Sequence, residues 1–323
     1  MTADSPRTVR ELGEFGLIAR MNAGRAQAPD VVLGPGDDAA VIAAPAGRYV
    51  VSADMLIQDR HFRLDWSSPR EIGAKAIAQN AADVVAMGSA PSAFLVSLGC
   101  PADTTVEFID GLVEGLWAEA GRAGGSIAGG DVVSAPLLVI SVTAFGDPAG
   151  RPPVLRSGAR PGDIVAVAGR LGWSAAGLAI LSAGLDCESC PELVAAHRLP
   201  CPPYEAVLDL PRGTAVTAMT DVSDGLLADI GHIAESSGVA IDLDTGSVRD
   251  ETLDHAAKLV DADPLAWALT GGEDHAFAAT FAAGQQLPDG WRRVGRVGAG
   301  AGVTVDGRGW TGLVGWESFT GGG

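Results

Sequence analysis

The stretch from Ser68 to Gly88 reads SPREIGAKAIAQNAADVVAMG and carries the clearest structural signal in the chain. Ser68 can cap a helix, Pro69 suits the first helical position, and Glu71 stands where a capping box needs an acid. The apolar run that follows predicts one long helix ending just before Gly88. Asp83 interrupts this run, and a lone carboxylate among Ala, Val and Met is costly unless it is paired or bound to a metal ion.

Short apolar and β-branched stretches lie on both sides of this helix and predict strands. In the first half we expect strands at 31–33, 40–43, 49–53, 93–98, 126–128 and 137–145, and further helices at 8–24 and 104–123. In the second half we expect strands at 163–168, 215–220 and 239–243, helices at 174–182, 192–197, 203–210 and 225–236, further helices to 269, and β segments with glycine turns from 275 onward. Strands and helices do not alternate strictly, so the predicted fold class is α+β.

The length and composition favour two domains. The chain has 323 residues, 47% of them apolar, which is enough for a sizeable core and too much for a disordered chain. Residues 146–163 contain four prolines, four glycines and three arginines with little periodicity, as domain junctions often do. We therefore predict an N-terminal domain over 1–150 and a C-terminal domain over 151–323.

The charge balance excludes several classes of partner. With 40 acidic against 22 basic side chains the net charge is -18, so the surface would repel a nucleic-acid backbone. No apolar run reaches the roughly 20 residues that span a bilayer, and the first residues do not resemble a secretion signal. Four cysteines are too few for a disulfide framework in a chain of this length. We expect a cytoplasmic protein that binds neither nucleic acid nor membrane.

The basic residues also restrict how the protein could bind a nucleotide. Only Lys75 and Lys258 are lysines, and neither lies in a Walker A loop or in the lysine motif of protein kinases. Aspartate (27 residues) outnumbers glutamate (13) two to one, and many aspartates lie in glycine-rich turns where a short carboxylate can reach a metal ion. Divalent cations are therefore the first candidate ligands.

Acidic side chains recur at five predicted turns and helix faces, any one of which could be an ordinary solvated turn. We expect Asp54 to end a strand and Asp131 to follow one, which places both where sites assemble. Three or more such carboxylates that converge would form a hard-cation site, and with phosphate oxygens a nucleotide–Mg²⁺ site. The five clusters are Gly36-Asp37-Asp38, Ser52-Ala53-Asp54, Asp83 in the long helix, Gly129-Gly130-Asp131, and Asp221-Val222-Ser223-Asp224-Gly225.

Three further features have both an ordinary and a functional interpretation. The segment Gly271-Gly272-Glu273-Asp274 is either a charged turn or a place where backbone closely approaches a ligand. His61 is either a plain loop histidine or a ligand contact. Arg156, near the predicted junction, is either an exposed linker arginine or a guanidinium that grips phosphate.

Taken in order, these motifs resemble the thiamine-monophosphate kinase family of the AIR synthetase-like (PurM-like) superfamily. The resemblance covers nearly the whole chain. It implies a two-domain PurM-like fold and transfer of the γ-phosphoryl group of ATP to thiamine monophosphate. It also implies a homodimer, built by the N-terminal domains as a shared sheet or barrel, with the active site in the cleft between domains. The motifs are GEFGLI (13–18), GPGDD (34–38), Asp54, His61-Phe62, residues 80–88, GGD (129–131), LRSGA (155–159), PGD (161–163), DVSDGL (221–226), GGED (271–274) and GWESF (315–319).

The resemblance also implies roles for individual residues. Asp38, Asp83, Asp131, Asp221 and Asp224 would be the catalytic carboxylates. The Mg²⁺ positions would be Asp38, Ser52, Ala53, Asp54, Asp83, Asp131, Asp221 and Asp224. ATP would contact Gly130, Asp131, Arg156 and Ser223, and thiamine monophosphate would contact His61, Glu273 and Trp316.

These roles agree with elementary chemistry. Two phosphate-bearing anions can meet on an acidic protein only if Mg²⁺ bridges carboxylates to phosphates. A phosphate acceptor is already a nucleophile, so neither a general base nor a covalent intermediate is needed. Glu273 could face the cationic thiazolium or the aminopyrimidine, and Trp316 offers an aromatic face to a cationic ring. The sequence leaves open the number of Mg²⁺ ions and the need for a monovalent cation.

The chain departs from the family pattern at two places. Ala53 stands where the family often has threonine, which leaves only a main-chain carbonyl as a possible ligand. The tail reads Trp316-Glu-Ser-Phe where the family commonly has an aromatic residue, an acid, His and Phe, so the residues that follow Trp316 differ from the family pattern.

Other interpretations remain open at this point. Aminoimidazole ribonucleotide synthetase shares the same ATP and Mg²⁺ chemistry. Selenophosphate synthetase needs a Cys or selenocysteine in its N-terminal segment, where this chain has none before Cys100, and a hydrogenase-maturation dehydratase of this fold would end in cysteine. A pure ATP-binding regulatory protein is another possibility. A structural zinc module is a different class, with candidate ligands at Cys187, Cys190, His197 and Cys201.

Overall fold

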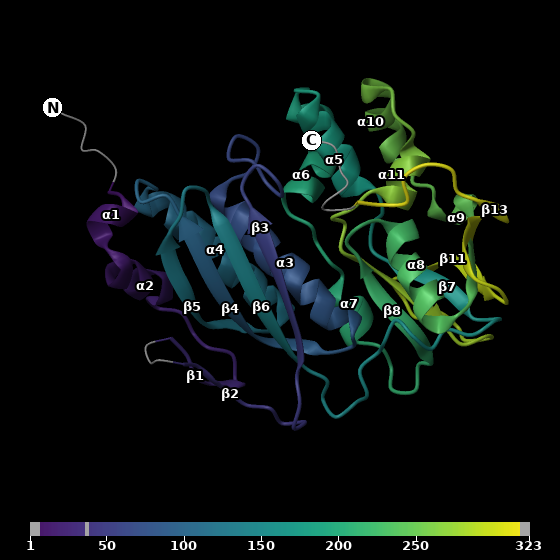
Figure 1. Ribbon diagram of the computed structural model, residues 1–323, viewed down its shortest axis with the longest axis horizontal. Helices are drawn as coiled ribbons and strands as arrows, with labels where there is room; N and C mark the ends of the chain where they lie inside the picture. Colours follow the sequence, from purple (N-terminus) through teal and green to yellow (C-terminus); the bar gives the residue numbers. More distant parts are fainter. Residues whose placement is uncertain (1–6, 36–38, 317–323) are drawn as a thin grey trace. The chain divides into compact units, whose positions relative to one another are not determined.

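The computed structural model describes residues 7–35 and 39–316, and the chain folds as two compact units (Figure 1). Unit 1 takes Met1–Val84 and Ser89–Arg151, and unit 2 takes Val85–Gly88 and Pro152–Gly323. Each unit has its own sheet and its own helices, and each is described by itself.

Unit 1 is built on a four-stranded sheet in the order β3-β6-β4-β5. β4 and β5 run parallel, and β6 is antiparallel to both of its neighbours, β3 and β4. β3 and β5 are therefore the two edges of the sheet. The strands are β3 (Val50–Ile57), β4 (Ala90–Cys100), β5 (Ser126–Ser134) and β6 (Val139–Asp147).

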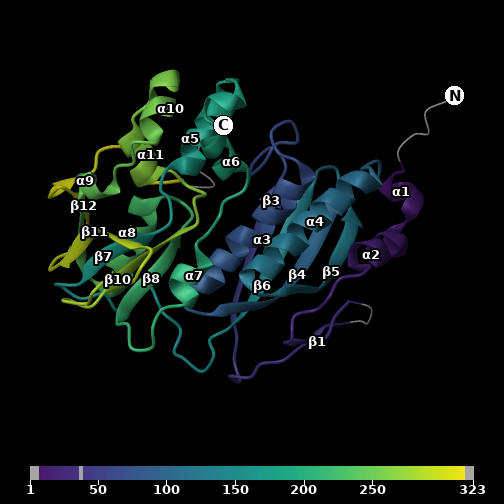
Figure 2. The same cartoon turned by 180° about the vertical axis from the view of Figure 1, so that it is seen from behind.

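Two long helices, α3 (Pro69–Ala86) and α4 (Val106–Ala123), cover one face of this sheet, as the view from behind shows (Figure 2). The predicted capping box is present, because the Ser68 amide donates to Glu71 Oε2 at 2.7 Å and the Glu71 amide donates to Ser68 Oγ at 3.3 Å. A side chain at Gly73 or Gly115 would collide with the backbone of the other helix, so these glycines let α3 and α4 pack in contact. The core between sheet and helices includes the fully buried Ile77, Phe94 and Leu112.

The N-terminal segment differs from the single helix expected over 8–24. It forms α1 (Val9–Leu12) and α2 (Glu14–Asn22), because Gly13 between them has a φ of 73° that interrupts the helix. A small ribbon of β1 (Val31–Leu33) and β2 (Val41–Ile42) follows and packs through Val31 on Ala93 and Ala128 of the sheet.

Unit 2 is built on a seven-stranded sheet in the order β13-β12-β9-β11-β7-β10-β8. Its pairs are antiparallel except for β9 and β12. The strands are β7 (Ile164–Ala168), β8 (Val216–Val222), β9 (Ala240–Leu243), β10 (Ala276–Phe281), β11 (Trp291–Gly298), β12 (Gly302–Val305) and β13 (Arg308–Gly309). The helices are α5 (Trp173–Ser182), α6 (Pro191–Arg198), α7 (Tyr204–Leu208), α8 (Leu226–Ser237), α9 (Thr245–Val248), α10 (Leu253–Val260) and α11 (Pro264–Thr270), with a 3₁₀ turn at Cys187–Ser189.

The α+β class is confirmed, and two local expectations are wrong. Asp54 does not end its strand, because β3 continues to Ile57, and Asp131 does not follow a strand, because β5 continues to Ser134. In both cases hydrogen bonding to a neighbouring strand extends the element past polar residues that alone suggest a stop. Among the described residues no helix has the length and apolarity that crossing a bilayer requires.

Candidate functional site

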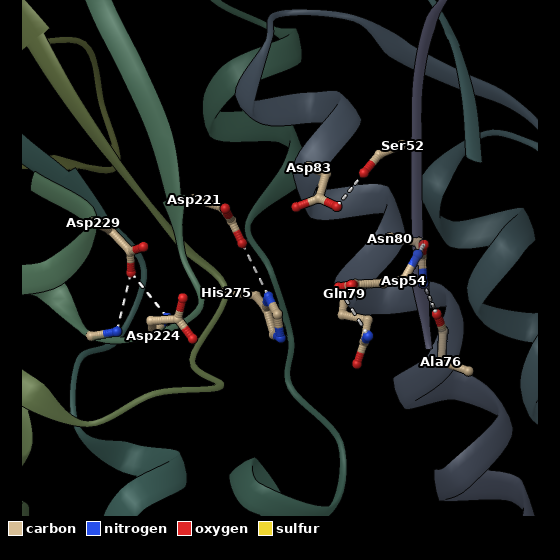
Figure 3. A network of polar contacts seen from close by, with 11 residues as sticks. Ser52, Asp54, Ala76, Gln79, Asn80, Asp83, Asp221, Asp224, Asp229 and His275 are labelled. Atoms are coloured by element: carbon tan, nitrogen blue, oxygen red, sulfur yellow. Dashed lines mark hydrogen bonds and ion pairs between the residues drawn. The ribbon is translucent and has the colours of Figure 1, made fainter. Parts of the chain in front are cut away.

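Unit 1 brings together the polar side chains of β3 and α3 (Figure 3). Ser52 Oγ donates to Asp83 Oδ2 at 2.6 Å, and Gln79 Nε2 donates to Asp54 Oδ2 at 3.2 Å. The Asp54 amide donates to Asn80 Oδ1 at 2.9 Å, so α3 also fixes the backbone of β3 here. Asp83 is half-buried. The two carboxylates come from β3 and α3, and hydrogen bonds join these two elements.

The donors in this cluster suit Mg²⁺. Asp54, Asp83 and Ser52 offer only oxygen atoms, which are the ligands that a hard cation prefers. Mg²⁺ usually takes one or two protein carboxylates and completes its shell with water and substrate phosphates. Within residues 7–35 and 39–316, no three His, Cys, Asp or Glu side chains are grouped so as to hold a metal by themselves. A cation here would complete its shell with water or with oxygens of a bound phosphate compound.

Ala53 offers fewer possible metal-ligand atoms than its neighbours Ser52 and Asp54. The Asp54 amide donates to Asn80 and therefore faces away from β6. In a strand, the N–H of one residue and the carbonyl of the residue before it point to opposite sides. The Ala53 carbonyl therefore points toward β6, where Ala53 is the partner of Thr143. Its methyl side chain has no ligand atom.

Asp131 lies at the opposite edge of the unit 1 sheet. β5 is separated from β3 by β6 and β4, so Asp131 and Asp54 are three strand spacings apart, roughly 14 Å at about 4.8 Å per strand. Asp131 is exposed, and its Oδ1 accepts the amide of Val132 at 2.9 Å. A side chain at Gly130 would lie 1.8 Å from the Val96 carbonyl, so close strand packing alone requires glycine at that position.

His61 lies in the loop that joins β3 to α3, and it is half-exposed. Its Nδ1 accepts the amide of Ile57 at 3.0 Å, and its carbonyl accepts from Lys75 Nζ at 2.9 Å. Phe62, the next residue, is buried and anchors the end of the loop.

Unit 2 gathers three of the predicted segments at the end of β8. The Glu273 amide donates to the Ser223 carbonyl at 2.7 Å, and the Trp316 amide donates to the Asp224 carbonyl at 2.9 Å. A side chain at Gly272 would come within 2.7 Å of the Ser223 carbonyl, so this glycine permits the contact. Glu273 is partly exposed and Trp316 is half-exposed. The structure thus places Ser223, Asp224, Glu273 and Trp316 together.

The segment around Glu273 is held in an uncommon backbone conformation. Glu273 and His275 have φ values of 62° and 49°, a region that non-glycine residues rarely adopt. The Asp274 carboxylate holds the segment by accepting the amides of Gly172 and Ser174 at the start of α5. His275 Nδ1 lies 3.2 Å from Asp221 Oδ2, and both side chains are buried (Figure 3).

Asp229 supports the segment 221–225 from inside the unit. Its Oδ2 accepts the amides of Asp224 at 3.0 Å and Gly225 at 3.1 Å. Burial, reinforced by the negative charges of Asp221 and Asp224, raises the pKa of Asp229 to about 7. A carboxyl group that tends to keep its proton therefore lies directly behind two predicted metal ligands.

Arg156 is exposed and its backbone is tied to α8, since the carbonyl of Arg156 accepts from Ser237 Oγ at 3.1 Å. The preceding residue, Leu155, accepts the amide of Met219 in β8 at 3.0 Å. The arginine thus belongs to a segment that runs along β8.

Two of the predicted motifs extend beyond the described residues. Gly36, Asp37 and Asp38 of the first acidic cluster lie outside them, and so do the residues that follow Trp316.

The zinc alternative gains no support from the described residues. His197 Nδ1 lies 3.1 Å from Ser174 Oγ and 3.6 Å from Glu273 Oε2, while Cys187 Sγ accepts from Arg198 at 3.6 Å. All four cysteines are free thiols.

Sequence reasoning assigned no role to several residues that the structure places beside the predicted ones. Gln79 and Asn80 precede Asp83 by one helical turn, a spacing that could have indicated a shared face. The contacts of Lys75 and His275 join positions 14 and 54 residues apart, which a local pattern does not reveal, whereas Asp229 lies only four residues after Gly225 at the start of a predicted helix. These five residues support others that the motifs had already marked.

Comparison with known proteins identifies the family. The family described as AIR synthase related protein, N-terminal domain, matches residues 36–147, and the corresponding C-terminal domain family matches residues 160–307. A thiamine-monophosphate kinase of Mycobacterium tuberculosis is 52% identical over 99% of this chain and 95% of its own length, and one of Corynebacterium glutamicum is 42% identical over 98% and 96%.

Among solved structures, AaThiL complexed with AMPPCP and TMP is 30% identical, with a TM-score of 0.79 over 98% of this chain and 100% of its own. Both the family models and these relatives cover most of the chain. The chain therefore belongs to the thiamine-monophosphate kinase family, and it is a kinase.

Proposed function

We propose that this protein transfers the γ-phosphoryl group of ATP to thiamine monophosphate and releases thiamine diphosphate and ADP. The observation that carries the proposal is the likeness, over nearly all of both chains, to AaThiL complexed with AMPPCP and TMP. AMPPCP stands in for ATP, because a methylene group replaces the oxygen between its β- and γ-phosphorus atoms. Cytoplasmic location remains an expectation from the sequence, and the four free cysteines are consistent with it.

We assign Mg²⁺ to the oxygen donors Asp54, Asp83 and Ser52 of unit 1 and to Asp221 and Asp224 of unit 2. Mg²⁺ would neutralise phosphate charge on a protein whose net charge is -18. Asp38 belongs to the same assignment on sequence grounds alone. Ala53 could offer Mg²⁺ only its main-chain carbonyl, and that carbonyl points toward β6.

The residues of the chain would bind and orient the two substrates. Arg156 is placed to hold ATP phosphates, with Gly130, Asp131 and Ser223 as further ATP contacts. Glu273 would face the cationic part of thiamine monophosphate, Trp316 would stack on it, and His61 would contact its phosphate.

Transfer would be direct. One oxygen of the acceptor phosphate forms a bond to the γ-phosphorus as the bond between that phosphorus and the ADP oxygen breaks. The acceptor oxygen carries a negative charge already, so no residue must remove a proton from it.

We also propose that the protein works as a homodimer in which each Mg²⁺ site takes carboxylates from both chains. One Mg²⁺ ion, with ligands at about 2.1 Å, cannot bind Asp54 and Asp131 of the same chain when they lie three strands apart. The edge strands β3 and β5 also expose Val51, Met55 and Val133. Pairing of β3 with β5 of a second copy would cover these side chains and bring Asp131 of the partner subunit to Asp54.

The central test is formation of ADP and thiamine diphosphate from ATP, thiamine monophosphate and Mg²⁺, followed by chromatography. Thiamine, which lacks the acceptor phosphate, is the matched control and should give no product. ADP formation that does not depend on thiamine monophosphate would reject the proposal and favour another ATP-dependent activity of the same fold.

A further inference from the structure

Lys75 is a lysine in an unusual environment. It lies on α3 with 1% of its surface exposed, and fully buried lysines are rare because the ammonium group must be compensated. The chain otherwise uses arginine, with 20 arginines against two lysines. One of the two lysines of the chain thus lies at this buried position, where its ammonium group can donate up to three hydrogen bonds.

Lys75 holds the loop that carries His61. Its Nζ donates to the His61 carbonyl at 2.9 Å across 14 residues of sequence. The loop is a tight turn in which Asp59 has a φ of 64° and its amide donates to the Phe62 carbonyl at 2.8 Å. With Phe62 buried beside it, His61 has a fixed backbone position.

The imidazole ring of His61 is fixed as well. The Ile57 amide can only donate, so the Nδ1 atom that it contacts at 3.0 Å must be an acceptor without a proton. The ring proton then resides on Nε2, which leaves a neutral imidazole with one N–H donor. Such a group can bind a phosphate oxygen by a single directed hydrogen bond.

We propose that Lys75 is a positioning residue, which fixes His61 so that its Nε2–H donates to the phosphate of thiamine monophosphate. The inference rests on the proposed function for the identity of the ligand, whereas the tautomer and the Lys75 contact rest on geometry alone. Lys75 itself touches no substrate in this proposal.

Steady-state kinetics of Lys75→Met provide the first test. The variant keeps an apolar stem and removes the donor, and we expect KM for thiamine monophosphate to rise about tenfold, the effect of one misplaced hydrogen bond. We expect kcat and KM for ATP to stay within about twofold. Lys258→Met, which removes the exposed second lysine, is the matched control and should change none of these values.

A double-variant comparison separates positioning from general stability. In a His61→Ala background, Lys75→Met should add little further loss, because the group that it positions is gone. Additive losses, or equal changes in KM for ATP, would overturn the positioning role. His61→Gln places an amide donor near the Nε2 position and should retain more affinity than His61→Asn.

A spectroscopic readout needs neither activity nor a folded variant. In the wild-type protein labelled with ¹⁵N-histidine, His61 should show an unprotonated Nδ1 and a protonated Nε2, and thiamine monophosphate should shift the Nε2 signal. A protonated Nδ1 would reject the inference. Wild-type protein that shows the expected tautomer but does not turn over thiamine monophosphate would reject the proposed function instead.

Discussion

At the scale of single residues, the carboxylates of unit 1 accept hydrogen bonds from neutral side chains of neighbouring elements. Asp83 accepts a hydroxyl from Ser52, and Asp54 accepts an amide from Gln79. Such hydrogen bonds orient a carboxylate toward a bound cation.

Asp83→Asn should lower kcat by about 100-fold or more. The free energy of unfolding should change by less than about 1 kcal/mol. The asparagine oxygen can still accept from Ser52 Oγ, whereas the negative charge is lost. Circular dichroism and a coupled ADP assay measure the two effects. Asp103→Asn, at an exposed carboxylate of the same unit, is the control. Wild-type turnover in a folded Asp83→Asn protein would contradict a metal role.

Glu273→Gln and Trp316→Ala should raise KM for thiamine monophosphate much more than KM for ATP, because both residues are assigned to the thiamine moiety. The Glu273 backbone is held by Ser223 and remains so in the variant. Initial rates with each substrate varied in turn decide the question. An equal loss for both substrates would contradict the assignment.

At the scale of elements, unit 2 shows how a helix start can support a site segment. The carboxyl group of Asp229, in the first turn of α8, accepts two amides of the segment that precedes the helix. Those hydrogen bonds keep Asp224 and Gly225 in place, and Gly225 has a φ of 121°.

The raised pKa of Asp229 makes stability depend on pH. Its pKa is 3.8 without the fold and about 7 in the folded chain, so the folded state binds a proton that the unfolded state has released. The resulting stabilisation is complete below about pH 4 and is lost as the pH rises through 7, by up to about 4 kcal/mol.

Asp229→Asn should flatten this part of the stability profile. Both amides bind the same oxygen, Oδ2, so an asparagine oxygen can accept both. Urea unfolding from pH 5 to 8 without divalent cations should show a smaller decline for the variant than for the wild type. Asp289→Asn, at an exposed position, should follow the wild-type curve. Parallel curves for Asp229→Asn and the wild type would show that another group causes the decline.

At the scale of the whole molecule, the proposed dimer makes a stoichiometric prediction. Asp54→Asn and Asp131→Asn should each be inactive alone. After subunit exchange, half of the dimers carry one chain of each variant, and one of their two sites is intact, so about a quarter of the wild-type activity should return.

Gel filtration with light scattering should show a dimer before and after exchange. If both aspartates acted within one chain, every site would remain damaged and no activity would return. Mixing Asp54→Asn with Asp83→Asn is the matched negative control, because both residues lie in the same β3–α3 cluster.

A phosphoenzyme is not expected at any stage. Incubation with γ-labelled ATP in the absence of thiamine monophosphate should leave no label on acid-precipitated protein. Stoichiometric label that passes into thiamine diphosphate would replace the direct mechanism with an acyl-phosphate route through Asp131 or Asp224.

Local sequence patterns determined much of the secondary structure of this protein and its family. The capped helix at 69–86, the strand 31–33 and the order of acidic motifs follow from residues that are neighbours in sequence, and so does membership of the kinase family. The predicted domain boundary near residue 150 stays a prediction.

Only the tertiary structure decided which of these groups meet. Asp54 and Asp131 lie at opposite edges of a sheet because strand order and register depend on pairing between distant segments. Lys75 reaches His61, and Glu273 reaches Ser223, because packed helices and loops bring them together across intervals of 14 and 50 residues. Capping and hydrophobic periodicity act over a few neighbouring residues and carry no information about such contacts.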